Sequence, residues 1–199
     1  MVVIVSGSTP EDSFKRTFAA APLHLQTERL HLRPYAFGDA GDIQRYAGDY
    51  DVARMTTSIP YPYEDGMAEE WIESQAAARE RGDELVWAIE PRDGGSLIGA
   101  IGMTGRPEIE AAEMGYWIAK PYWGRGYATE AARAVISCGF DTMGLHRIYA
   151  RHWTHNPASG RVMQKAGMTY EGTLRHSSRR FGDWHDVAFY SILRSEYRP

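Results

Sequence analysis

The sequence predicts a mixed α+β fold, in which helices flank a central, mostly antiparallel twisted sheet. Two apolar runs at 85–89 and 97–101 enclose Pro91-Arg92-Asp93-Gly94-Gly95, a combination that indicates a β-hairpin. Two more strand-like runs, at 112–119 and 147–153, each lead into a helical pattern. Hairpins combined with strand–helix pairs favour an α+β domain over an all-parallel sheet.

The elements before the hairpin follow from local patterns. Leu30-His31-Leu32-Arg33 alternates apolar and polar residues, which predicts a half-buried first strand. A short helical pattern follows at about 39–46, and residues 59–63 contain two prolines that predict a loop. The spacing of apolar residues predicts an amphipathic helix over 64–81, which Gly82 ends.

The chain after the hairpin alternates helix and strand. A helix is predicted at about 127–140, beyond a loop that contains glycines. Asn156 and Pro157 are a suitable N-cap and first residue for a second helix, which runs to Lys165. Two strand-like runs lie in the tail between Met168 and Arg194.

Length and composition predict one domain. With 199 residues, 43% of them hydrophobic, the chain suits a single core, which we place at 23–199. Residues 6–22 are rich in Ser, Thr, Pro and Ala, so we expect 1–22 to be a poorly ordered lead-in. No apolar run approaches the roughly 18 residues that span a membrane, and no targeting signal is evident. A cytoplasmic location without a membrane partner is therefore expected.

The composition also disfavours several classes of function. Lys and Arg number 22 and Asp and Glu 26, giving a formal net charge of −4, whereas non-specific nucleic-acid binding needs a basic surface. Cys138 is the single cysteine, which excludes an internal disulfide framework and a cysteine-based metal cluster. We expect Cys138 to be a small buried residue, and we expect no metal and no nucleic-acid partner.

The segment 116–130 carries the most informative pattern, an apolar strand followed by a loop with Gly124 and Gly126 and then by a helix. A helix N-terminus preceded by glycines presents unpaired N–H groups and a partial positive charge, which suits a phosphate. Tyr127 stands where a P-loop has lysine, and Thr129 stands where a dinucleotide-binding fingerprint has its third glycine. Both of those nucleotide sites are therefore disfavoured.

Three patterns in one order resemble a known family. They are Ala112-Glu113-Met114-Gly115-Tyr116-Trp117-Ile118, Tyr122-Trp123-Gly124-Arg125-Gly126-Tyr127-Ala128-Thr129-Glu130-Ala131, and Asn156-Pro157-Ala158-Ser159-Gly160-Arg161-Val162-Met163-Gln164-Lys165-Ala166-Gly167-Met168. Together they resemble the GCN5-related N-acetyltransferase (GNAT) superfamily, and within it the RimJ/RimL-like ribosomal-protein N-acetyltransferases. The resemblance covers about 27–195. It implies a GNAT-type sheet in which a splayed strand pair forms the acetyl-CoA cleft.

The resemblance implies acetyl-CoA as the donor and assigns residues to it. The pyrophosphate is expected on the loop and helix start, at Trp123, Gly124, Arg125, Gly126, Tyr127, Ala128 and Thr129. Trp123 departs from the usual Gln or Arg, but the phosphate contacts come chiefly from backbone N–H groups. The pantothenate arm is expected on the backbone of Trp117, Ile118 and Ala119 and on the side chain of Asn156. Arg161 and Lys165 either reach a phosphate or form a solvated face.

Two residues are candidates for the acyltransferase chemistry. Glu113 alternates with Gly115 and Trp117 on one strand face, so its carboxylate is either the base that deprotonates the amine or a group that orients it. Ser159 matches the position near the CoA sulfur and is expected to stabilise the leaving thiolate by a hydrogen bond. Further candidates, held in reserve as relays or alternative acids, are His152, His155, His185, Tyr122 and Tyr170.

The expected activity is acetyl transfer by direct attack of a primary amine in a ternary complex, with a protein or peptide N-terminal α-amine favoured. An α-amine with a pKa of about 8 is roughly a tenth neutral at pH 7, so a weak base suffices. The alternatives are a small-molecule amine such as an aminoglycoside or polyamine, and a non-catalytic acetyl-CoA-binding module. We expect the acceptor cleft to be formed by 46–63 and 176–184. Paired copies are common in the family, which leaves a homodimer open.

Overall fold

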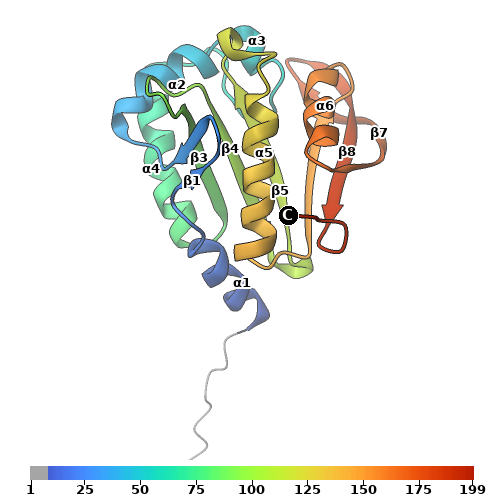
Figure 1. Cartoon of the computed structure of the whole chain (residues 1–199). Coiled ribbons are helices and arrows are strands. Elements are labelled where there is room, and N and C mark those ends of the chain that lie inside the picture. Colours follow the sequence, from blue (N-terminus) through green and yellow to red (C-terminus); the bar gives the residue numbers. More distant parts are fainter. Residues whose placement is uncertain (1–8) are drawn as a thin grey trace, which may run out of the picture.

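An eight-stranded sheet organises residues 9–199, the part of the chain that the computed structural model describes (Figure 1). The strand order is β1-β2-β3-β4-β5-β6-β8-β7, and every neighbouring pair is antiparallel except β5 and β6. The predicted α+β class is confirmed. The strands are β1 (Leu25–Gln26), β2 (Leu30–Arg33), β3 (Glu84–Pro91), β4 (Gly99–Arg106), β5 (Ala111–Ile118), β6 (Arg147–Trp153), β7 (Thr169–Arg180) and β8 (Asp183–Leu193).

Helices cover both faces of this sheet (Figure 1). They are α1 (Pro10–Ala19), α2 (Ala40–Ala47), α3 (Tyr50–Ala53), α4 (Met67–Glu80), α5 (Tyr127–Ser137) and α6 (Pro157–Lys165). The larger buried cluster packs α5 and α6 against one face, for instance Val135 against the strand that carries Met114. A smaller cluster with Ile43 and Ile72 packs α2 and α4 on the other face. The two faces are therefore shielded by different helices.

The predicted strands follow their hydrophobic alternation. Leu30 and Leu32 are fully buried, whereas His31 and Arg33 between and after them are half-buried. The hairpin of β3 and β4 pairs from Glu84 opposite Thr104 to Ile89 opposite Gly99. Because the side-chain period of a strand is two, burial of alternate residues fixes which face each strand turns to the core.

Helix α1 corrects the expectation of a poorly ordered lead-in over 1–22. Thr9 accepts from the Asp12 amide and Asp12 accepts from the Thr9 amide, and Pro10 is the first helical residue. Phe14 and Phe18 lie one turn apart and stack, with Phe18 buried in the core. Polar residues that we took for a loop are thus helix-capping residues. Residues 1–8, the rest of that segment, lie outside the described residues, and the domain start at 23 stays a prediction.

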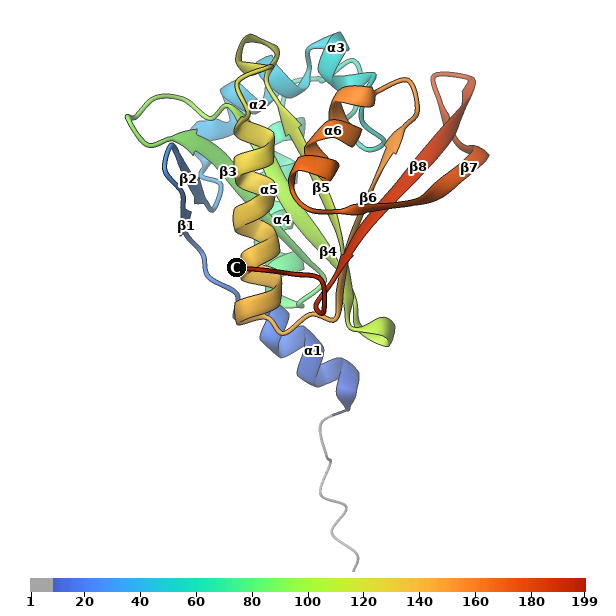
Figure 2. The ribbon, with the colours of Figure 1, turned by 45° about the vertical axis from the view of Figure 1, so that its right-hand side comes forward.

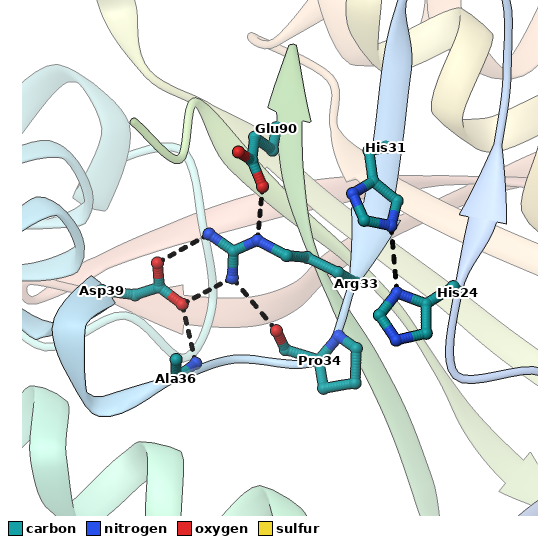
Figure 3. A network of polar contacts seen from close by, with 7 residues as sticks. All are labelled: His24, His31, Arg33, Pro34, Ala36, Asp39 and Glu90. Atoms are coloured by element: carbon teal, nitrogen blue, oxygen red, sulfur yellow. Dashed lines mark hydrogen bonds and ion pairs between the residues drawn. The ribbon is translucent and has the colours of Figure 1, made fainter. Parts of the chain in front are cut away.

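A polar network fixes the approach to α2 (Figure 3). Arg33 donates from both terminal nitrogens to Asp39 at 2.8 Å and also pairs with Glu90. Burial alone raises the pKa of Asp39, but the hydrogen bonds from Arg33 and from the Ala36 amide outweigh it and leave the pKa lowered. The network anchors the turn before α2 to β2 and β3. Beside it the imidazoles of His24 and His31 stack with 3.0 Å between ring nitrogens.

Cys138 lies buried in the core, and burial raises the pKa of its thiol to about 11, which confirms a packing role. None of the helices within residues 9–199 is both long and apolar enough to cross a membrane. The same residues contain no group of three or more His, Cys, Asp or Glu side chains placed to hold a metal ion.

Candidate active site

The sheet opens between β5 and β6. These parallel strands pair only from Ala111 opposite Arg147 to Glu113 opposite Tyr149. Beyond that point β5 stays with β4 and β6 stays with β8, and Figure 2 shows β7 and β8 leaning away from β4 and β5. A cavity of about 1060 Å³ lies here, lined by β5, β6, α6 and the start of α5. This is the splayed pair that the family resemblance implies.

The backbone of β5 presents alternate residues to the opening. The Ala119 amide donates to the Ile98 carbonyl at 2.8 Å, and the Ala119 carbonyl accepts from Tyr122. A Cβ on Gly99 would lie 2.3 Å from the Trp117 carbonyl oxygen, so that carbonyl also points to β4. Since backbone groups alternate sides along an antiparallel strand, Ile118 turns its amide to the opening.

The three predicted backbone contacts, at Trp117, Ile118 and Ala119, differ in how their backbone groups are oriented. Ile118 faces the opening by this alternation, whereas the Trp117 carbonyl points to β4 and the Ala119 amide and carbonyl are bonded to Ile98 and Tyr122. The expected contacts of Trp117 and Ala119 with a cofactor stay predictions. By the same alternation the backbone of Tyr116 faces the opening, and Tyr116 was not among the residues predicted from the sequence. The Trp123 indole N–H donates to the Ile118 carbonyl at 2.6 Å, which ties the loop to the end of β5. The sequence predicted the strand but not which of its edges would be free.

The glycine loop has the backbone expected of a phosphate cradle. Gly124 and Gly126 have φ of +75° and +83°, a region that favours glycine. The first ladder bond of α5 runs from the Glu130 amide to the Gly126 carbonyl, so the three preceding amides, those of Tyr127, Ala128 and Thr129, lie ahead of the ladder. These amides and the positive end of α5 favour an anion.

Arg29, the residue before β2, braces this loop. Its Nε and Nη2 lie 2.7 and 2.6 Å from the Glu130 carboxylate, and its Nη1 donates to the Arg125 carbonyl at 3.1 Å. Thr27 Oγ1 also donates to Glu130, at 2.6 Å. Burial raises the pKa of Glu130, but these hydrogen bonds leave it lowered. The brace went unpredicted because its residues lie about a hundred positions apart in the sequence.

Helix α6 places two predicted residues at the opposite wall. Asn156 Oδ1 accepts from the Ser159 amide at 3.3 Å, which confirms the N-cap and leaves the Asn156 Nδ2 hydrogens for a ligand. Ser159 Oγ lies 2.9 Å from the Tyr116 hydroxyl, which also donates to the Ser159 carbonyl at 2.9 Å. Tyr116 therefore connects β5 to α6 across the opening. Arg161 and Lys165 line the cavity on exposed positions of α6.

Glu113 lies on the other face of the sheet, the face on which α2 and α4 pack. Its Oε1 is 2.7 Å from Arg151 Nε, and its Oε2 is 3.7 Å from Arg106 Nη2 and 3.3 Å from the Tyr149 hydroxyl. Both oxygens of the Glu113 carboxylate therefore already have polar partners. The geometry favours an orienting role for Glu113 over the role of base.

The remaining candidate residues lie at different distances from the cavity and in different surroundings. His155 stacks on Trp153, and the ring of His185 lies tilted against the same indole, on the acceptor side. Burial, followed by the charges of His185 and Arg54, lowers the pKa of His155. His152 lies under α6, with its Nδ1 2.8 Å from the Trp153 carbonyl oxygen. Tyr122 lines the cavity, whereas Tyr170 is exposed on β7 and contacts Thr173.

Both expected acceptor segments border the cavity. Residues 54–60 line it, as does Ser178 of β7. Arg180 donates to the carbonyls of Thr57 and Ile59 and so joins the β7–β8 hairpin to that loop. Glu84, at the start of β3, also lines the cavity, although no motif in the sequence marks it.

Comparison with known proteins identifies the family. A model described as Acetyltransferase (GNAT) domain matches residues 29–169. The chain belongs to the GNAT family. This GNAT chain is 35% identical over 180 residues to N-acetyltransferase YoaA of Bacillus subtilis, covering 85% of this chain and 96% of YoaA. It is 29% identical over 94 residues to the ribosomal protein uS5-alanine N-acetyltransferase of Escherichia coli, covering 47% and 48%.

Solved GNAT structures share the fold. The GNAT acetyltransferase of Bacillus anthracis matches with a TM-score of 0.77 and 29% identity over 87% of this chain and 99% of that one. RimJ of Mycobacterium smegmatis, in complex with CoA-disulfide, matches with a TM-score of 0.75 and 25% identity over 84% and 83%. The chain is therefore an N-acetyltransferase of a family that uses acetyl-CoA, and its relatives include ribosomal-protein N-acetyltransferases.

Proposed function

We propose that this GNAT enzyme transfers an acetyl group from acetyl-CoA to a primary amine, in the first place the α-amine of a peptide or protein N-terminus. One observation carries the proposal: the opening between β5 and β6 connects the two faces of the sheet. The glycine loop and Ser159 lie at its α5–α6 side, and Glu113 lies at its α2–α4 side. The donor and the acceptor can therefore enter the opening from opposite faces of the sheet.

The residues on the donor side fit acetyl-CoA. The three free amides at the start of α5 suit the pyrophosphate, and the loop glycines allow its close approach. The Ile118 and Tyr116 backbone and the Asn156 amide suit the pantetheine arm. Bound acetyl-CoA supplies the thioester carbonyl carbon that the amine attacks. The contacts of the individual loop residues with acetyl-CoA stay proposals.

Ser159 is the proposed partner of the leaving thiolate. Its hydroxyl lies 2.9 Å from that of Tyr116, so the two hydroxyls are joined by one hydrogen bond. When the Tyr116 hydroxyl donates to the Ser159 carbonyl, the Tyr116 oxygen can accept a hydrogen bond from the Ser159 hydroxyl. The Ser159 hydroxyl proton can then be directed either to Tyr116 or to the CoA sulfur. A hydrogen bond of this kind stabilises negative charge as the carbon–sulfur bond breaks.

An α-amine suits this site because it needs less help from a base than a lysine side chain does. Glu113 is held by Arg151 and Arg106. A lysine side chain with a pKa near 10.4 is almost wholly charged at pH 7, whereas an α-amine with a pKa of about 8 is roughly a tenth neutral. The name of the uS5-alanine acetyltransferase relative agrees with an N-terminal acceptor.

The test is release of free CoA, measured with a thiol reagent, from acetyl-CoA and a panel of amines. The panel contains peptides that begin with alanine, spermidine and kanamycin, and the control is the same peptide with an acetylated N-terminus. Turnover of the free peptide supports the proposal. Turnover of spermidine or kanamycin alone favours the small-molecule alternative, and acetyl-CoA binding without any turnover favours a binding module. A homodimer and a cytoplasmic location stay predictions.

A further inference from the structure

Two carboxylates stand in one row across the acceptor face. Glu84 of β3 lies opposite Thr104 of β4, which lies opposite Glu113 of β5. Residues directly opposite each other in neighbouring strands turn their side chains to the same face. Both glutamates line the cavity. They are two strands apart, about 10 Å between Cα atoms at the usual strand spacing.

The two carboxylates differ in their partners. Glu113 is held by two arginines and a tyrosine hydroxyl. Within residues 9–199 no cation pairs with Glu84, and its polar contact is the Thr104 hydroxyl at 3.5 Å. Burial raises the pKa of Glu84, and only the Thr104 hydrogen bond opposes this. Glu84 is half-buried, and a partly desolvated carboxylate without a cation is unfavourable, so such a group points to a cationic ligand.

The sheet surface on the face of Glu84 is open at Gly115 of β5. The next row along the same face is Val86, Gly102 and Gly115, from β3 to β5. A Cβ on Gly115 would meet nothing within 4 Å, so it would project into open space. A Cβ on Gly102 would lie 3.0 Å from Val86 Cγ2, so the Val86 side chain borders Gly102, and the open part of this row is at Gly115, beside the divergence of β5 and β6. An amine can lie on that open part, on the same face as Glu84.

We propose that Glu84 is the carboxylate that binds the ammonium ion of the acceptor and accepts its proton, directly or through one water. Glu113 then acts as a positioning residue that holds Arg106 and Arg151 at the edge of the same cavity. The inference rests on the proposed function, because it names the acceptor group of that reaction. The ligand class is a primary ammonium ion.

The proton balance of this step is complete. The ammonium ion gives one proton to Glu84, and the neutral nitrogen forms a bond to the thioester carbonyl carbon. The carbon–sulfur bond then breaks, and its electron pair leaves with the sulfur. The second nitrogen proton ends on the CoA thiolate, and Glu84 returns its proton to solvent. The products are an N-acetyl amine and free CoA.

The test compares Glu84→Gln with Glu73→Gln, an exposed glutamate on α4 that loses the same charge. With an amine that the wild type acetylates, Glu84→Gln should lower kcat/KM by about 10²- to 10⁴-fold, as for loss of a general base. The acetyl-CoA affinity should not change. The Tm of Glu84→Gln should equal or exceed that of the wild type, because a desolvated carboxylate has been removed. Glu73→Gln should match the wild type in all three measurements.

Unchanged kcat/KM in Glu84→Gln overturns the proposal, and so does a clear loss of Tm or of acetyl-CoA affinity, which would mean a structural role. If no panel amine is acetylated, the proposed function has failed at its acceptor step. Calorimetry of the same amines with the CoA-bound protein then decides the role of Glu84. At least tenfold weaker binding to Glu84→Gln supports it, and equal binding, or none to either protein, overturns it.

Discussion

The glycine at the start of α5 offers the sharpest test of the donor site. Gly126 has φ of +83°, and the nearest atom to an added Cβ is Arg29 Nη2 at 3.5 Å, an ordinary contact. Gly126→Ala therefore meets no steric block, and its cost is the left-handed backbone, about 1–2 kcal/mol. The loop can relieve that strain by rotating, which moves the amides that follow it.

The expected loss of affinity follows from those amides. A hydrogen bond to a charged group contributes about 1.5–3 kcal/mol. Loss of one amide contact to the pyrophosphate therefore weakens acetyl-CoA binding about 10- to 150-fold, since 1.4 kcal/mol is a factor of ten. Gly126→Asp should weaken it further, because a carboxylate would then face the phosphates.

Gly144→Ala is the matched control. Gly144 also has a positive φ, +67°, and an added Cβ would meet nothing within 4 Å. It lies beyond the far end of α5, more than about 16 Å away along an eleven-residue helix. Both variants should lose about 2–8 °C of Tm, and calorimetry should show weaker acetyl-CoA binding only for Gly126→Ala. Equal acetyl-CoA affinity in the two variants would refute the cradle.

Three further predictions follow from the same contacts. Arg29→Met should weaken acetyl-CoA binding about tenfold with little change in kcat at saturation, because it frees the Glu130 carboxylate beside the loop; a change in kcat alone would contradict the brace. Ser159→Ala should lower kcat about tenfold and leave the calorimetric affinity for acetyl-CoA unchanged; an unaltered kcat would remove it from the chemistry. Asp39→Ala should cost about 1.5–3 kcal/mol of unfolding free energy in urea titrations at pH 7, because Arg33 loses its charged hydrogen bonds to Asp39 and keeps Glu90 as a partner. Since the pKa of Asp39 is lowered, its contribution is full above about pH 4 and is lost as the pH falls through the folded-state value, so wild type and variant should converge in acid; a constant gap would refute this.

Local patterns in the sequence predicted much of the fold. The alternation of Leu30 and Leu32, the hairpin at 85–101 and the N-cap at Asn156 are all present in the structure. So is the helix that begins at Tyr127 after the positive-φ Gly126. Each of these depends on residues within a few positions of one another, because capping, turn conformation and side-chain period are properties of the local backbone.

The tertiary structure alone decided the contacts that complete the site. Arg29 reaches Glu130 only because β2 lies beside the start of α5. Glu84 and Glu113 share a row only because β4 pairs with both β3 and β5 in one register. The residues of β5 likewise did not determine which of its two edges would be free, because β4 occupies one edge and β6 pairs with only the first part of the other. The sequence by itself determined the strand, loop and helix that suit a donor phosphate. Strand pairing, which depends on residues far apart in the chain, placed Glu84, which has no cationic partner among residues 9–199, in the same cavity as Glu113.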